Sequence, residues 1–573
     1  MFYLQREEYD AVVVGSGVSG GWAAKELTEK GLRTLVLERG RNVEHQKDYI
    51  TEHVPPWDMP YRNRRITPEM YPEQAVQIRG NTVDSGNRHF YQNDKRHPYI
   101  EAAPFTWVQA EVVGGRSLLW GRQCYRWSDL DFEANLRDGH GIDWPIRYAD
   151  IAPWYSYVER FIGVSGERLG LPQLPDGEFQ PPMELNAGEK FVKEGVERAF
   201  PGRKVTIGRS AVLTRPIGNR AACHYCGECS RGCSTGSYFS SQSSTLPAAF
   251  ATGRLTLRPH SLVHSLIFDE DLNRVTGVRF VDTETGDMHE VYAQVIFLCA
   301  SALGSTRVLL NTRTSEHPDG LGGNSGALGR YLMDHHFRVG ASGEIPGLLD
   351  RYYEGRRPNG IYIPRFRNLA GPDSDRLDFV RGYGYQGSAS RAGWSRGAGM
   401  AELGAELKQA LRDPGPWRIS IGSWGECLPR EDNTALLSDK TDQWGIPLLE
   451  INCTWGPNEF AMRRDMAQQA AEMLEAAGCR NVTTFDNFED GSYGAEPGLC
   501  IHEMGTARMG RDPSNSVLNG YNQVWASPNV FVTDGACMTS SSCVNPSITY
   551  MALTARAADY AVNALKRGEL VKA

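Results

Sequence analysis

The spacing of apolar residues near the start of the chain predicts a strand, a helix and a second strand in succession. Residues 9–14 form a short apolar run typical of a buried strand, and the stretch from Trp22 to Lys30 has the composition of a helix. A further apolar strand at residues 35–37 leads directly to Glu38. Because a glycine-rich turn joins the first strand to the helix, this is a βαβ unit, and it predicts an α/β fold with a Rossmann-like sheet.

Longer patterns predict further elements along the chain. Residues 254–300 alternate between apolar and polar positions and are interrupted by turn signals, which indicates several strands, and a helix is expected at about residues 302–310. Residues 419–453 again predict strands, and residues 458–477 predict an amphipathic helix. Residues 340–415 are rich in glycine, arginine and proline and show little periodicity.

Length and charge narrow the class of protein. The 573 residues exceed an ordinary single domain, so we expect two domains. The formal net charge of −8 argues against a nucleic-acid partner and against electrostatic anchoring to a membrane. No apolar run reaches the roughly 18 residues that span a bilayer, so no transmembrane segment is expected. Glu7 and Glu8 stand where a signal peptide carries positive charge, and we expect no export signal in the chain itself.

The turn after the first strand, Gly15-Ser16-Gly17-Val18-Ser19-Gly20, matches the fingerprint of dinucleotide-binding sites. In such a turn Gly15 permits the tight bend, Gly17 lets the pyrophosphate approach the backbone, and Gly20 lets helix and strand pack closely. Glu38 follows Gly15 by 23 residues, about where an acidic side chain binds the adenosine ribose. Residues 382–387 match the same pattern, but no helix pattern follows them, so we interpret them as a loop or the end of a strand.

Further segments favour a flavin over a nicotinamide cofactor, which the fingerprint alone does not distinguish. Residues 113–117 form a second glycine loop, residues 299–305 end the later buried strand, and residues 529–535 form a strand that ends in an acid and a glycine. Residues 502–510, His-Glu-Met-Gly-Thr-Ala-Arg-Met-Gly, and residues 544–549, Val-Asn-Pro-Ser-Ile-Thr, complete the set. In content and order these segments resemble the motifs of the glucose–methanol–choline (GMC) flavoprotein oxidoreductases.

The resemblance to the GMC family covers most of the chain and implies its fold. It implies a Rossmann-like FAD-binding domain assembled from residues 1–139, 201–335 and 492–573. It also implies a substrate domain with an antiparallel sheet and helices, formed mainly by residues 140–200 and 336–491.

The same resemblance implies a cofactor, FAD. Some family members attach FAD covalently through a histidine, and Leu119 occupies that position here, so we expect FAD to be bound without a covalent bond. The residues expected to contact FAD are Gly15, Ser16, Gly17, Gly20, Glu38, Arg39, Gly114, Gly115, Ser117, Val263, Ala300, Asp534, Gly535, Asn545 and Pro546.

Oxidation of an alcohol by hydride transfer needs a base for the hydroxyl proton, and histidine suits this task because its ordinary pKa lies near 6.5. The resemblance implies that His502 is this base and that Asn545 hydrogen-bonds the substrate oxygen. The other twelve histidines are interpreted as structural. These include the adjacent His335 and His336. The two are not expected to bind a metal as a pair, because neighbouring side chains diverge on regular elements.

Four cysteines, Cys223, Cys226, Cys229 and Cys233, have the C-x2-C-x2-C-x3-C spacing of ferredoxin-type iron–sulfur ligation. Structural zinc sites usually draw on two well-separated pairs, which makes zinc the weaker alternative, and a purely structural cluster is the third. We therefore expect a 3Fe–4S or 4Fe–4S cluster. Whether three cysteines, with Cys226 omitted, or all four are ligands stays open.

The cysteine run also resembles that of the flavoprotein subunits of sugar dehydrogenases such as gluconate 2-dehydrogenase and glucoside 3-dehydrogenase. This implies oxidation of a secondary alcohol of a sugar, with C3 of glucosides or glucose as the first expectation. Gluconate 2-dehydrogenase activity, glucose 1-dehydrogenase activity and an oxygen-using sugar oxidase are the alternatives. The implied partners are a small subunit and a cytochrome c acceptor, in the periplasm after co-export with the partner or else in the cytoplasm.

Overall fold

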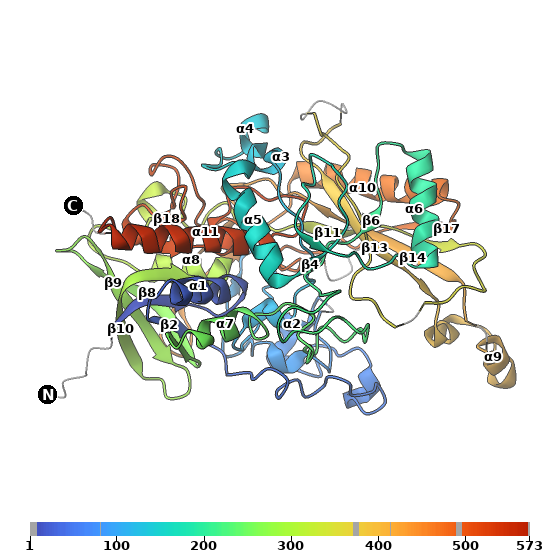
Figure 1. The fold of residues 1–573 in the computed structure, drawn as a ribbon, viewed down its shortest axis with the longest axis horizontal. Helices are drawn as coiled ribbons and strands as arrows, with labels where there is room; N and C mark the ends of the chain where they lie inside the picture. Colours follow the sequence, from blue (N-terminus) through green and yellow to red (C-terminus); the bar gives the residue numbers. More distant parts are fainter. Residues whose placement is uncertain are drawn as a thin grey trace.

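The computed structural model describes residues 8–80, 82–353, 355–370, 377–412, 414–488 and 495–570. Among these residues two large sheets make up the two halves of the molecule, one mainly parallel and one antiparallel (Figure 1). An α/β fold with a second, antiparallel sheet is the fold class that the sequence predicts.

The first sheet has a parallel centre. β1 (Glu8–Val14) lies between β2 (Thr34–Leu37) and β10 (Met288–Leu298), and both pairs are parallel. β7 (Leu255–Arg258) and β19 (Ser527–Val532) extend the sheet on its two sides, also in parallel. Alternate residues of β1 enter two different apolar clusters, one on each face of the sheet. Burial on both faces explains why its sequence is a continuous apolar run.

Helix α1 (Val18–Glu29) begins four residues before the predicted start at Trp22. Its first turn contains Ser19 and Gly20, which carry no apolar pattern, and the helical pattern in the sequence therefore begins one turn late. α1 packs against α11 (Ser547–Lys566) and α7 (Thr245–Ala251). Its amino end, with backbone N–H groups that lack helical partners, lies within the fingerprint and begins at Val18.

The strands predicted between residues 254 and 300 are present. β8 (Ser261–Asp269) and β9 (Arg274–Asp282) form an antiparallel ribbon that continues onto the first half of β10. α8 (Ala302–Asn311) follows β10 and agrees with the predicted helix. β18 (Gln523–Val524) pairs antiparallel with β19.

The second sheet is antiparallel throughout, in the order β17, β11, β14, β13, β12, β6. α10 (Pro457–Ala476), which matches the predicted amphipathic helix, and α6 (Ala187–Ala199) pack against it and against each other (Figure 1). A separate apolar core lies between these helices and the sheet. The strands are β6 (Thr206–Ile207), β11 (His336–Ile345), β12 (Ile361–Ile363), β13 (Tyr383–Arg391), β14 (Trp417–Gly425) and β17 (Arg480–Asp486).

Residues 382–387, which resemble a second fingerprint, enter the first half of β13. A Cβ atom at Gly387 would lie 2.3 Å from the Ser420 carbonyl oxygen on β14, so glycine is required there by the close approach of two strands. Of the two alternatives, the strand is therefore correct, although the segment begins β13 and does not end it.

The remaining elements lie outside the two large sheets. α5 (Tyr148–Ile162) packs against α11, beside the parallel sheet. In the part of the chain that the structure describes, every helix is too short or too polar to cross a membrane. The other elements are α2 (Ala75–Ile78), α3 (Asp129–Phe132), α4 (Ala134–Asp138), α9 (Gly404–Ala410), β3 (Ile100–Glu101), β4 (Val164–Ser165), β5 (Phe179–Gln180), β15 (Thr434–Thr441) and β16 (Pro447–Asn452).

Candidate active site

A cavity of about 420 Å³ lies at the carboxyl ends of the parallel strands. It extends from Glu38, at the end of β2, to His502 and Asn545, which come from two loops near the end of the chain. Ligands of open parallel sheets bind at this edge, so the position is the expected one for a dinucleotide. The single cavity joins the fingerprint at one end to the predicted catalytic residues at the other.

The three fingerprint glycines meet different surroundings. Gly15 has a φ of +94°, and a Cβ there would lie 2.5 Å from the Cys299 carbonyl oxygen. A Cβ at Gly20 would lie 1.9 Å from the Gly15 carbonyl oxygen, so α1 packs directly on the turn. A Cβ at Gly17 would meet nothing within 4 Å, and Gly17 lines the cavity. The backbone at Gly17 is therefore open to a phosphate group, beside the amino end of α1.

Glu38 is held by the turn that it faces. Its Oε2 accepts hydrogen bonds from the Ser16 backbone N–H at 3.0 Å and from the Ser16 hydroxyl at 2.6 Å. Its Oε1 accepts from the Gly40 N–H at 2.9 Å. The neighbouring Arg39 lines the same cavity and donates to the Gln92 side chain at 2.9 Å. A fixed carboxylate at this edge suits the hydroxyls of a ribose.

Most of the residues expected to contact FAD line the cavity, and three lie just outside it. Gly20 is covered by the Gly15 carbonyl, a Cβ at Gly114 would face the Gln242 side chain at 3.0 Å, and Pro546 caps α11. The cavity-lining residues among the predicted set are Gly15, Ser16, Gly17, Glu38, Arg39, Gly115, Ser117, Val263, Ala300, Asp534, Gly535 and Asn545, and Leu119 lines it as well.

His502 and Asn545 lie next to each other. His502 Nε2 and Asn545 Nδ2 are 3.4 Å apart, and both residues line the cavity. Gln386 on β13 donates from its Nε2 to Asn545 Oδ1 at 2.7 Å. Because the Asn545 carbonyl oxygen is engaged by Gln386, the amide NH2 group is the part that faces His502.

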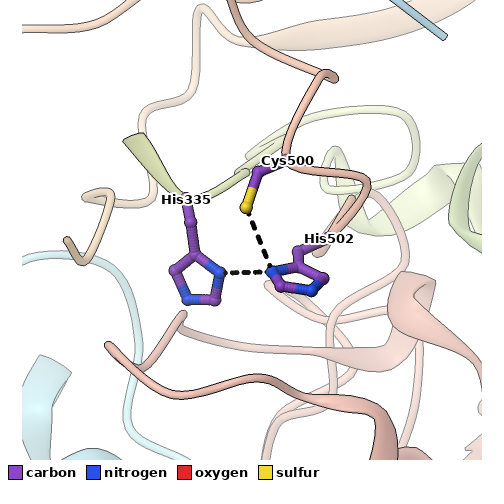
Figure 2. A group of neighbouring side chains, drawn as sticks. All are labelled: His335, Cys500 and His502. Atoms are coloured by element: carbon purple, nitrogen blue, oxygen red, sulfur yellow. Dashed lines mark hydrogen bonds between the residues drawn. The ribbon is translucent and has the colours of Figure 1, made fainter. Parts of the chain in front are cut away.

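His335 is a site residue that the sequence interpretation left among the structural histidines. Its Nδ1 lies 2.8 Å from His502 Nδ1 (Figure 2). Its Nε2 lies within hydrogen-bonding distance of the Ser542 carbonyl oxygen. Cys500 Sγ lies 3.3 Å from the same His502 Nδ1. The side chains of His335 and His336 diverge, as expected, but the His335 side chain points toward His502. The segment 324–335, which ends at His335 and resembles a GMC motif, was the signal in the sequence.

Burial lowers the pKa of both imidazoles. It lowers the pKa of His502 well below the usual 6.5, and His335 and Arg116 act in the same direction. It lowers the pKa of His335 to about 4. Arg116 is itself paired with Glu503 through two hydrogen bonds of 3.0 Å. Both histidines are therefore neutral at pH 7, and His502 is in the form that accepts a proton.

His335, Cys500 and His502 also have the composition of a metal site, since their ligand atoms lie within 4.8 Å of one another. Two imidazole nitrogens on one tetrahedral zinc ion would be about 3.3 Å apart, whereas 2.8 Å is a hydrogen-bond distance. Burial raises the pKa of the Cys500 thiol well above its usual value, which disfavours the thiolate that a metal needs. The geometry is that of a hydrogen-bonded pair of histidines.

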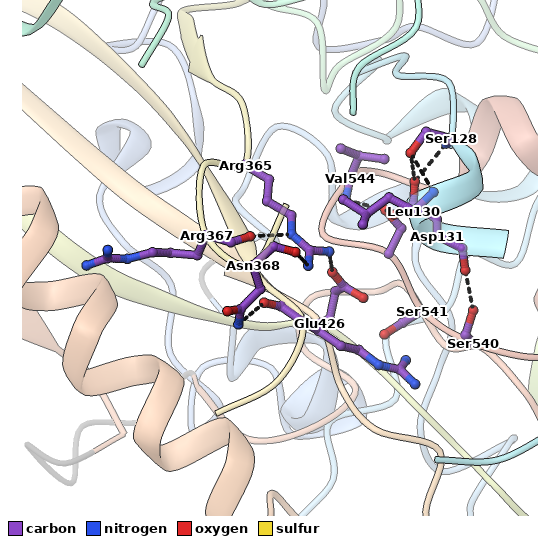
Figure 3. Close-up of polar contacts among 12 residues, drawn as sticks. Ser128, Leu130, Asp131, Arg365, Arg367, Asn368, Glu426, Ser540, Ser541 and Val544 are labelled. Carbon is purple, nitrogen blue, oxygen red and sulfur yellow. Dashed lines mark hydrogen bonds and ion pairs between the residues drawn. The ribbon is translucent and has the colours of Figure 1, made fainter. Parts of the chain in front are cut away.

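The loop that carries Ser542 and Asn545 is fastened by a buried polar network (Figure 3). The Ser542 hydroxyl donates to Asp131 Oδ1 at 2.6 Å, and the Ser540 hydroxyl donates to the Asp131 carbonyl oxygen at 3.3 Å. On the other side, Ser541 Oγ accepts from the Cys427 N–H and donates to the Cys427 carbonyl oxygen, both at 2.9 Å. Contacts from two directions hold Asn545 in a defined position.

Residues 9–337 and residues 429–554 match the amino- and carboxyl-terminal family models of GMC oxidoreductases. The chain belongs to the GMC oxidoreductase family. It is 30% identical to 2-methyl-1,2-propanediol dehydrogenase of Mycolicibacterium austroafricanum, over 97% of this chain and 95% of the relative. It is 25% identical to the fructose dehydrogenase large subunit of Gluconobacter japonicus, over 98% of each chain.

Among solved structures, pyridoxine 4-oxidase from Mesorbium loti matches with a TM-score of 0.58 and 17% identity, over 96% of this chain and 98% of that one. This match supports the GMC fold. Family members bind FAD and oxidise CH–OH groups of alcohols or sugars, and this GMC oxidoreductase is an enzyme of that kind. The fixed carboxylate, the open backbone at Gly17 and the length of the cavity fit the cofactor.

The cysteine run of this GMC oxidoreductase is gathered and half-buried, with all four thiols free. Burial raises the pKa of Cys223 and of Cys229, and the other thiols of the run contribute to both shifts.

Two side chains connect the cysteine run to the cavity. The Tyr238 hydroxyl donates to the Ser117 carbonyl oxygen at 2.8 Å, and Ser117 lines the cavity. The guanidinium of Arg122, also in the cavity wall, lies 4.8 Å from the centre of the Tyr238 ring. Arg122 acts on Cys229 as well, lowering its pKa against the larger effect of burial.

Proposed function

We propose that this GMC oxidoreductase is a sugar dehydrogenase that oxidises a secondary alcohol, with C3 of glucosides or glucose as the preferred position, to a ketone. The observation that carries the proposal is the pair of His502 Nε2 and Asn545 Nδ2, 3.4 Å apart at one end of the cofactor cavity. A hydroxyl group placed between these atoms meets one hydrogen-bond acceptor and one donor.

The two side chains divide the work on that hydroxyl. His502 Nε2 takes the hydroxyl proton, and its lowered pKa keeps it available as a base at neutral pH. The Asn545 NH2 group donates a hydrogen bond to the same oxygen, which orients the carbinol carbon. FAD, when bound, supplies the acceptor for the hydride that leaves this carbon. A positioned base of this kind contributes about 10²- to 10⁴-fold to the rate.

The lining of the cavity supports a polyhydroxylated substrate. It includes the charged Arg122, the amide of Gln123 and the apolar Trp120. Sugars present many hydroxyls beside weakly polar ring faces, and such a mixed lining suits them. The relative named fructose dehydrogenase large subunit acts on a sugar. The choice of C3 rests on the resemblance of the whole chain and on no individual residue.

We further propose that the cysteine run binds an iron–sulfur cluster and that electrons leave through it to a cytochrome-type acceptor. The supporting observations are the spacing of the four cysteines, the hydrogen bond from Tyr238 to Ser117 in the cavity wall, and the electrostatic interactions of Arg122 and Tyr238 with Cys229. A bound cluster would supply one-electron transfer. The relative named as a large subunit supports a small partner subunit. Co-export with that subunit to the periplasm is part of this proposal.

An anaerobic bleaching screen of the bound flavin tests the proposed substrate. Glucose, methyl glucoside, gluconate, fructose and 1,2-propanediol are added separately, and the flavin absorbance is followed. Fast bleaching by glucose or methyl glucoside, with a 3-keto product identified by NMR, is the expected result. Fast bleaching by the diol alone would replace the sugar with a simple diol. Peroxide formed at the rate of turnover in air would replace the dehydrogenase with an oxidase.

A further inference from the structure

We propose that His335 is a positioning residue that selects the tautomer of His502 in which Nε2 is unprotonated. The inference rests on the proposed role of His502 as the base. It follows from a chain of three groups, the Ser542 carbonyl, the His335 ring and the His502 ring, joined by the contacts at His335 Nε2 and His335 Nδ1.

The direction of each hydrogen bond in this chain is fixed by its first member. A backbone carbonyl oxygen only accepts, so the contact with Ser542 requires the proton of His335 to be on Nε2. A neutral imidazole carries one proton, and His335 Nδ1 is therefore an acceptor. His502 Nδ1, at 2.8 Å, must then donate. The single proton of neutral His502 is thereby assigned to Nδ1, and Nε2 is left with its lone pair toward Asn545 and the cavity.

The backbone holds the two rings in this relation. Asp334 Oδ1 accepts from the His335 N–H at 2.8 Å and from the His502 N–H at 3.2 Å, and its Oδ2 accepts from the Gly498 N–H at 2.8 Å. Met333 and Met504 exchange two backbone hydrogen bonds of 2.9 Å. The segment before β11 and the segment that carries His502 are therefore clamped together beside the two imidazoles.

A nearby thiol explains why His502 needs His335 Nδ1 as a hydrogen-bond acceptor. Cys500 Sγ lies 3.3 Å from His502 Nδ1, and its raised pKa keeps it as S–H, which can donate a weak hydrogen bond. Without His335, an S–H donor at Nδ1 would favour the opposite tautomer, with the proton on Nε2. The imidazolium formed when His502 takes the substrate proton would also lose the acceptor for its Nδ1–H.

Two substitutions separate this role from a purely structural one. His335→Leu removes the acceptor. His335→Asn can offer its amide oxygen near the position of Nδ1 but loses the contact with Ser542. For the FAD-loaded enzymes, with flavin content and melting temperature recorded, we expect kcat/KM to fall by the order of 10² in His335→Leu and by less than about 10-fold in His335→Asn. Equal losses in both variants would overturn the proposal.

A spectroscopic measurement provides a second readout that does not depend on turnover. In FAD-loaded protein labelled with ¹⁵N-histidine, the His502 signals are assigned by their loss in His502→Ala. We expect Nδ1 of His502 to carry the proton in the native enzyme and Nε2 to gain it in His335→Leu. A native His502 protonated at Nε2 would overturn the proposal, whatever the variants do.

The two proposals fail in different ways. If His502→Ala keeps normal flavin reduction, the base assignment fails, whereas the tautomer measured by NMR still tests the contact with His335. If His502→Ala is inactive and His335→Leu is as active as the native enzyme, the base assignment stands and the positioning role of His335 is overturned.

Discussion

Gln386 Nε2 lies 2.7 Å from Asn545 Oδ1, and this hydrogen bond joins the antiparallel sheet to the loop before α11. The two residues are 159 positions apart in the sequence. Since Gln386 can donate to the Asn545 carbonyl, the Asn545 NH2 group is left toward His502. The antiparallel sheet thus determines which end of the Asn545 amide faces His502.

Substitution of Gln386 should therefore lower kcat/KM by changing the orientation of the Asn545 amide. Gln386→Glu replaces the donor with a carboxylate, which attracts the Asn545 NH2 group and turns its carbonyl toward His502. We expect kcat/KM to fall by about 10- to 100-fold, the equivalent of about 1.4 to 2.7 kcal/mol of transition-state stabilisation. Gln386→Leu removes the donor without offering an acceptor to the Asn545 NH2 group, so its loss of kcat/KM should be smaller. Ser388→Ala on the same strand is the control. A lower kcat/KM in Gln386→Leu than in Gln386→Glu would contradict the argument.

Loss of the base should separate flavin binding from turnover. His502→Ala should retain FAD, since the fingerprint lies at the opposite end of the cavity, and flavin reduction should slow by at least ~100-fold. Stopped-flow absorbance under anaerobic conditions measures this step directly. His140→Ala, at an exposed histidine, is the matched control. Near-normal flavin reduction in His502→Ala would remove this residue from the role of base.

The parallel half of the fold could be predicted because its elements are local and strongly patterned. Alternate residues of β1 are buried on the two faces of the sheet, so the strand is apolar at every position. The strands of the antiparallel half could not be predicted between residues 340 and 415, because the sequence there shows little periodicity. A Cβ at Gly340 would lie 2.0 Å from the Ile421 carbonyl oxygen, so glycine is selected there by its neighbour on β14. Such a requirement leaves no periodic signal in the sequence.

The candidate site shows the same limit. His502 lies in a recognisable motif, and the fingerprint residues follow a local strand–turn–helix pattern. His335 and Gln386 contact the pair of His502 and Asn545 across 167 and 159 residues of sequence. These contacts form only when the folded chain brings distant loops and β13 together. Local patterns in a single sequence therefore do not predict them.

The pH dependence should reflect the buried state of the base. Burial lowers the pKa of His502 well below 6.5, and the base is active only when unprotonated. Activity is therefore lost as the pH falls through this lowered pKa, so the acidic limb of kcat/KM should lie below pH 6.5. Rates measured between about pH 4 and pH 8, with flavin content checked at each pH, test this. A limb centred at or above 6.5 would contradict the burial argument.

Two fingerprint glycines should respond differently to one added methyl group. A Cβ at Gly17 meets no protein atom within 4 Å, so Gly17→Ala should fold normally, but the methyl group enters the space for the pyrophosphate. We expect an unchanged melting temperature without FAD and an FAD affinity at least ~10-fold weaker, about 1.4 kcal/mol. In Gly20→Ala the Cβ would lie 1.9 Å from the Gly15 carbonyl oxygen, so α1 must shift. A cost of about 1–3 kcal/mol in unfolding free energy is expected there. The pair is distinguished by thermal unfolding of the FAD-free proteins together with FAD titration.

Removal of single cysteines should distinguish the three interpretations of the run. Cys223 Sγ accepts the Tyr225 N–H at 3.4 Å, and Cys229 is influenced by Arg122 in the cavity wall, so these two thiols are the ones that the fold most directly fixes. Cys229→Ser should therefore lose iron and acid-labile sulfide, whereas Cys226→Ser should retain a three-iron cluster with its own EPR signal. Cys479→Ser, remote from the run on the antiparallel half, should keep native iron content.

Flavin reduction by substrate should survive in Cys229→Ser, because the hydroxyl is activated by His502, while transfer to an external one-electron acceptor should fall. Native enzyme purified without oxygen and found free of iron would exclude the cluster, and bound zinc in its place would establish the zinc alternative.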